Sequence, residues 1–287
     1  MGSTSSPSRE IEFDMKESEL RGRSSLEIFE RFLTCKLHDK NRVLLTHPYM
    51  NTEPICVARI SFKRHDVVLM LSHKKGESKH VERRIVDYID KRVSKGAILK
   101  PGAKIIIYST FSPCSDCIKK SMESGYGITY IFSAIYFQVP RPSCEKRGCE
   151  CFKIDEDFTE PCRRALKRLG KSKRVEAKRF TPEDWEELEE ILARWDKEKS
   201  LAQLRKVKKK YEPLRRLEDD ELQKDYDTLA GIVPSGLSSP MSADRDAGSS
   251  QGAGKRPTSS ENEERKFKTL KSGDDISIKR HVTKSAI

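Results

Sequence analysis

The pattern of the chain predicts an α/β fold. Short runs rich in Ile and Val alternate with longer segments whose apolar residues recur every three or four positions. The strand-like runs are residues 55–62, 67–71, 105–108, 128–137 and 175–180. The run at 105–108 is continuously apolar, which is typical of a central strand covered on both faces. Alternation of this kind indicates a sheet flanked by helices.

The N-terminal segment is predicted to be flexible before the first helix. Residues 1–20 are polar and rich in Ser, and such termini are often mobile. Ser24 and Ser25 favour a helix start, so a helix is expected from there to about Leu33.

The first two strands are predicted to form an antiparallel hairpin. His65 and Asp66 lie between the runs at 55–62 and 67–71 and favour a turn. Cys56 lies within the first run and is interpreted as a small core residue.

A buried helix is predicted to begin near residue 81. Val81, Ile85, Ile89 and Val93 recur every four positions and form one apolar face. This helix should pack on the sheet, with its charged residues facing away from the core.

A further helix is predicted to begin at Thr159-Glu160-Pro161, because Pro is well tolerated in the first helical turn. Its inward face would carry Cys162, Ala165, Leu166 and Leu169, and its outward face would be strongly basic. Residues 175–180 are expected to form a short edge strand.

The C-terminal third is predicted to contain fewer core residues the further it extends. Thr181 begins a further helix, whose residues Trp185 and Trp195 are interpreted as core. Residues 197–230 read as a charged helical extension with a break near Pro213. Residues 231–287 are rich in Ser, Gly, Asp and Lys, which predicts a disordered tail.

Composition favours a polyanionic partner. The chain has 287 residues and a formal net charge of +12, and charged residues (36%) slightly outnumber apolar ones (35%). A basic excess of this size favours nucleic acid before anionic membrane. No apolar run approaches the length of a membrane span. With eight cysteines and no secretory signal pattern, we expect reduced thiols and a location in the nucleus, the cytoplasm or both.

The most informative motif is His80-Val81-Glu82 followed by Pro113-Cys114-Ser115-Asp116-Cys117. It supplies one imidazole, two thiols and one carboxylate. Cys114 and Cys117 are three apart, so both sulfurs would emerge from one face at a helix start, where the helix dipole favours thiolate. Three N and S ligands leave the fourth tetrahedral position of a Zn²⁺ ion open, which is typical of a catalytic site.

Glu82 is therefore predicted to be the catalytic residue, with His80, Cys114 and Cys117 as the zinc ligands. The alternative is a closed structural zinc site, in which Cys144, Cys149 or Cys151 would supply a fourth ligand. A carboxylate two residues after the His has no purpose there. These three cysteines and Cys162 match no second metal template and are interpreted as scattered thiols.

The motif resembles that of the zinc-dependent nucleobase deaminases. The segment Ser109-Thr110-Phe111-Ser112-Pro113-Cys114 is similar to the Ser-Trp-Ser-Pro-Cys motif of the AID/APOBEC family of polynucleotide cytidine deaminases. Ser133-Ala134-Ile135-Tyr136-Phe137 is similar to the strand end that opens that family's substrate loop. The resemblance covers roughly residues 25–195 and departs from the family at Phe111, where the family usually has Trp.

This resemblance implies a cytidine-deaminase-like fold over residues 21–196, with a five-stranded mixed sheet flanked by helices. It also implies hydrolysis of cytosine to uracil in single-stranded nucleic acid, with DNA favoured over RNA. Tyr136 matches an aromatic that packs beside the target base, although a core role for it is the alternative. Phe137 begins the loop that reads the preceding nucleotide.

The resemblance implies two further substrate contacts, and two alternative functions stay open. Phe111 would form part of the pocket floor, and His73 lies near the place of a family Asn that contacts the nucleotide. A deaminase of free cytidine or deoxycytidylate is one alternative function. A nucleic-acid-binding protein with weak or lost turnover is the other.

Overall fold

A computed structural model of the chain describes residues 11–20, 22–37, 54–73, 79–135, 142–145, 156–195 and 201–232. All of these residues lie in a compact unit spanning Met1–Ser238. The predicted disordered tail, residues 231–287, lies outside them from position 233 onward. No helix among the described residues is long and apolar enough to cross a membrane.

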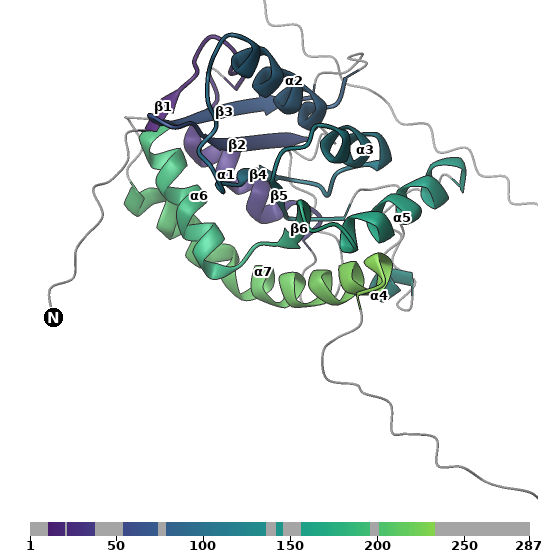
Figure 1. Cartoon of the computed structure of the whole chain (residues 1–287). Coiled ribbons are helices and arrows are strands. Elements are labelled where there is room, and N and C mark those ends of the chain that lie inside the picture. The colour runs from purple at the N-terminus through teal and green to yellow at the C-terminus, as the bar shows by residue number, and fades with distance from the viewer. Residues whose placement is uncertain are drawn as a thin grey trace, which may run out of the picture. The chain divides into compact units, whose positions relative to one another are not determined.

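The structure confirms an α/β fold built on one mixed sheet (Figure 1). The strands are β1 (Ile11–Phe13), β2 (Ile55–Ser61), β3 (Asp66–Ser72), β4 (Ile105–Ser109), β5 (Ile128–Phe132) and β6 (Val175–Arg179). The helices are α1 (Ser25–Thr34), α2 (Val81–Ser94), α3 (Ser115–Glu123), α4 (Pro142–Glu145), α5 (Glu156–Gly170), α6 (Pro182–Trp195) and α7 (Leu201–Ala230).

The sheet has the strand order β1-β3-β2-β4-β5-β6. β2 pairs antiparallel with both β3 and β4, which confirms the predicted hairpin. β4, β5 and β6 are mutually parallel, and β1 pairs parallel with β3. The continuously apolar strand β4 is central, and β6 lies at one edge, as predicted.

The prediction of five strands is wrong, because β1 adds a sixth at the other edge of the sheet. This finding also corrects the expected flexibility of residues 11–20. The Ser18 hydroxyl accepts a hydrogen bond from Met70 N–H, and Leu20 is fully buried. Glu19 forms an ion pair with Arg84 on α2. A strand of three residues is too short for its alternation of apolar and polar side chains to stand out, so its pattern gave no clear signal.

Two apolar cores cover the two faces of the sheet. Alternate strand residues contribute to opposite cores, as the period-two geometry of a strand requires. One core contains buried residues of α2, α3 and α5, and the other contains those of α1 and α6. Cys56 and Trp185 are buried in them, as predicted.

Helix α7 contributes to both cores and is part of the folded unit rather than an appended extension. Leu204 and Tyr211 pack in the core with α1 and α6, whereas Leu222 and Tyr226 pack in the core with α2, α3 and α5. Figure 1 shows α7 passing along the edge strand β6, from α6 towards α5 and α4. The charged composition of this segment concealed its apolar stripe.

Two predicted helix boundaries also differ. α7 continues through Pro213 without the expected break. Pro removes one backbone hydrogen bond, to the carbonyl of Lys209, and both residues are exposed, so water can replace it. α5 begins at Glu156, which places Pro161 inside the helix rather than in its first turn. The buried residues Cys162 and Leu166 hold this helix against the sheet.

The strand predicted over residues 128–137 ends at Phe132. Beyond it the backbone joins the loop that follows β4, where Ser112 N–H donates to the carbonyl of Ala134 at 2.7 Å. The two loops therefore brace each other at the ends of the two central parallel strands.

Burial along α7 predicts a sharp contrast between two leucines on the same helix. Leu222 is fully buried and Leu217 is 60% exposed. We expect Leu222→Ala to lower the free energy of unfolding by about 2–5 kcal/mol, because it leaves a cavity. Leu217→Ala should change it by less than about 0.5 kcal/mol. Urea denaturation measures both, and equal effects would show that α7 is not part of the core.

Candidate metal centre

The first residues of two neighbouring helices form the site. His80 is the N-cap of α2, and Glu82 lies in its first turn. Cys114 is the N-cap of α3, and Cys117 lies in its first turn. α2 and α3 pack against each other, each following one strand of the sheet. The sheet thus brings together residues that are more than thirty positions apart in the sequence.

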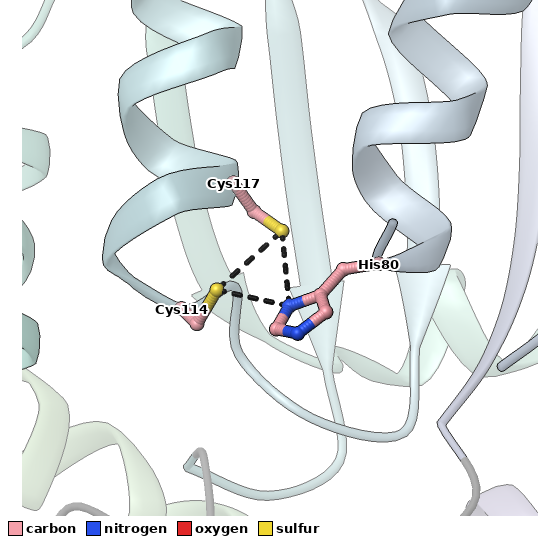
Figure 2. Close-up of side chains that lie close together, drawn as sticks. All are labelled: His80, Cys114 and Cys117. Carbon is pink, nitrogen blue, oxygen red and sulfur yellow. Dashed lines mark hydrogen bonds between the residues drawn. The ribbon is translucent and has the colours of Figure 1, made fainter. Parts of the chain in front are cut away.

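The imidazole and the two thiols converge on a common point (Figure 2). His80 Nδ1 lies 3.1 Å from Cys114 Sγ and 3.6 Å from Cys117 Sγ, and the two sulfurs are 3.5 Å apart. Tetrahedral zinc with Zn–S bonds of about 2.3 Å and Zn–N bonds of about 2.0 Å would separate its ligand atoms by about 3.5–3.8 Å. The three atoms therefore fit such an ion with small adjustments.

The structure shows that His80, Cys114 and Cys117 form a group that could hold a metal ion. Cys114 is 7% exposed and Cys117 is 1% exposed, while His80 is half-buried at the rim. Two sulfurs and one imidazole nitrogen suit zinc better than magnesium or calcium, which prefer oxygen ligands. The described cysteines are free thiols, so both sulfurs are available as ligands.

Hydrogen bonding polarises the two thiols in the metal-free site. The hydrogen bond shared with Cys117 lowers the pKa of Cys114 to about 4, and His80 adds to the effect. The same hydrogen bond raises the pKa of Cys117 above its ordinary value, as burial also does. The bond to Cys114 raises the pKa of His80. A thiolate therefore lies beside an imidazolium. A metal cation bound by the thiolates can take the place of the positive charge of the imidazolium.

Glu82 is a buried carboxyl group beside the three ligands but not one of them. It is 6% exposed, and the Cys117 thiol donates to its Oε2 atom at 3.4 Å. Burial, followed by the negative charge of Cys114, raises its pKa to about 7. A carboxyl group with this pKa can both accept and release a proton near neutral pH, as a general acid–base group requires.

The structure brings only some of the predicted substrate contacts to the site. The His73 ring lies edge-on to the His80 ring, with 5.5 Å between centroids. Phe111 belongs to the loop before Cys114 and is only 7% exposed, so little of its surface is open to a ligand. Tyr136 and Phe137 lie outside the described residues, as do Cys149 and Cys151.

Sequence reasoning missed the residues that support the loop before Cys114. Thr110 and Ile55 exchange two hydrogen bonds, from Ile55 N–H to Thr110 Oγ1 (3.1 Å) and from Thr110 N–H to the carbonyl of Ile55 (3.0 Å). The Cys56 thiol donates to the Ser109 hydroxyl. Small hydroxyl residues before a Pro-Cys pair were the available signal, but their partners are remote in the sequence.

No protein-family model matches the chain, and no curated protein matches it significantly.

Removal of the Glu82 charge should stabilise the metal-free protein in a pH-dependent way. Because the folded state holds the Glu82 proton more tightly than the unfolded chain, the contribution of Glu82 to the free energy of unfolding should fall as pH rises from about 4.5 to about 7. Glu82→Gln removes this dependence and should gain on the order of 3 kcal/mol over wild type at pH 8, but little at pH 4.

Denaturant unfolding after chelation measures this difference, with the exposed Glu123→Gln as the matched control. An equal difference between Glu82→Gln and wild type at both pH values would contradict the raised pKa of Glu82.

Proposed function

We propose that the chain is a zinc-dependent deaminase that converts cytosine to uracil in single-stranded nucleic acid, with DNA favoured over RNA. The observation that carries this proposal is the buried carboxyl group of Glu82 beside a trio of nitrogen and sulfur ligands. A structural zinc site needs no such group, whereas hydrolysis needs a proton acceptor next to the ion.

The residues of the site would divide the reaction between them. His80, Cys114 and Cys117 would hold the zinc ion, which lowers the pKa of a coordinated water to near 7. Glu82 would accept a proton from the water that adds to C4 of the base. The same carboxyl group would deliver protons to ring N3 and then to the departing amine. Cytosine and water are thereby converted to uracil and ammonia.

A basic face on α5 supports the proposal of a polynucleotide substrate. α5 packs against α3, the helix that carries both thiols. Its inward residues are buried as predicted, and its exposed residues include Arg164, Lys167 and Arg168. Cationic side chains on one face attract a phosphate backbone, and free nucleosides require none. With a net charge of +12 for the chain, this face favours nucleic acid over a mononucleotide.

The measurement is uracil formation from a single cytosine in a DNA oligonucleotide, with matched RNA and free deoxycytidine. Wild-type protein should act on the DNA, with binding that weakens as salt rises. Glu82→Gln should lower turnover by about 10²–10⁴-fold while zinc content stays at one ion per chain, because the carboxyl group moves protons but does not hold the metal.

The outcomes separate the candidate functions. Turnover of free deoxycytidine alone would assign the protein to nucleotide metabolism. Oligonucleotide binding without turnover, with zinc present, would indicate a binding protein. Loss of zinc from Glu82→Gln would show that the role given to Glu82 is wrong.

A further inference from the structure

A buried ion pair on α7 has no part in the proposed deamination. Arg215 is 2% exposed and Asp219 is 3% exposed. Arg215 Nε donates to Asp219 Oδ1 at 2.8 Å, and the Trp185 indole N–H donates to Asp219 Oδ2 at 3.3 Å. Buried pairs of this kind contribute little net stability but are geometrically demanding. The other N–H groups of the Arg215 guanidinium bind parts of the chain outside α7.

Both arms of the Arg215 guanidinium reach backbone carbonyls of other elements. Nη2 donates to the carbonyl of Ser133, just after β5, at 2.8 Å. Nη1 donates to the carbonyl of Cys35, at the end of α1, at 3.3 Å. A planar guanidinium with five donors can hold these two groups and a carboxylate at once, whereas a lysine ammonium cannot.

The two contacted residues lead to the same loop, residues 109–112, which precedes Cys114. Ser133 N–H donates to the carbonyl of Ser109 at 3.1 Å. The Cys35 thiol donates to the carbonyl of Thr110 at 3.2 Å. Arg215 is thus one hydrogen bond removed, by two routes, from the segment that precedes the candidate metal ligand Cys114.

A second buried residue of α7 holds the next described piece of the chain. Asp225 is 4% exposed, and it accepts hydrogen bonds from the backbone N–H of Ser143, at 2.9 Å, and from the Ser143 hydroxyl. Ser143 belongs to α4, between β5 and α5. α7 therefore contacts the exit of β5 through Arg215 and α4 through Asp225.

We propose that Arg215 is a positioning residue of the metal site and that Asp225 positions α4. Arg215 fixes the Cys114 loop and the exit of β5 relative to each other. Neither role depends on the proposed deaminase function.

Hydrogen–deuterium exchange tests the anchoring without any activity assay. Arg215→Lys should speed exchange about tenfold in peptides that cover residues 105–118 and 128–135. Asp225→Asn and Ser143→Ala should do so only in the peptide that covers α4. The matched controls are Arg216→Lys, which changes the exposed neighbour, and Asp227→Asn, whose partner Gln223 lies on α7 itself.

Zinc affinity, measured by competition with a chelator, gives a second readout. Arg215→Lys should weaken it about tenfold, because a displaced Cys114 loop holds the ion less well; outer hydrogen bonds of metal sites commonly have effects of this size. Asp225→Asn should leave it unchanged. Unaltered exchange and zinc affinity in Arg215→Lys would overturn the role of Arg215. If that variant does not fold, a zinc affinity lowered in Asp225→Asn, or α4 exchange unaltered in it, would overturn the proposal.

Deamination kinetics then separate this proposal from the proposed function. If wild type deaminates nothing, the proposed function fails, and the exchange and zinc results still decide whether α7 positions the metal site.

Discussion

The close approach of one imidazole nitrogen and two sulfurs is the constraint on which the site depends. His80, Cys114 and Cys117 bring their ligand atoms within 4.8 Å of one another in a largely buried place. Thiols and an imidazole in such contact share protons and charge, as the opposed pKa shifts of the two cysteines show. A cation that binds all three satisfies the same groups at once. The sheet order and the starts of α2 and α3 create this geometry.

The support of this geometry comes largely from elements outside the motif. α7 packs in both cores of the sheet, and its buried Arg215 holds Ser133 and Cys35, which in turn contact the loop before Cys114. At the other edge, Glu19 pairs with Arg84 on the helix that begins after His80. The segment between β1 and α1 thus braces α2, and the last described helix braces the loop before Cys114.

Much of the centre of the fold could be predicted from the sequence, because apolar periodicity reports burial. The hairpin of β2 and β3, the central β4 and the helix starts at His80 and Cys114 follow from local patterns. β1 and the packing role of α7 could not, since a strand of only three residues and a highly charged helix carry little periodic signal. The two backbone carbonyls that Arg215 binds lie 82 and 180 residues away, beyond any local pattern.

X-ray absorption at the zinc edge of the purified protein would show whether His80, Cys114 and Cys117 form the open zinc site that we propose. The account predicts one zinc ion per chain with two sulfurs at about 2.3 Å and two nitrogen or oxygen neighbours at about 2.0–2.1 Å. Three or four sulfur neighbours would indicate a closed structural site, and a protein without zinc would contradict the account altogether.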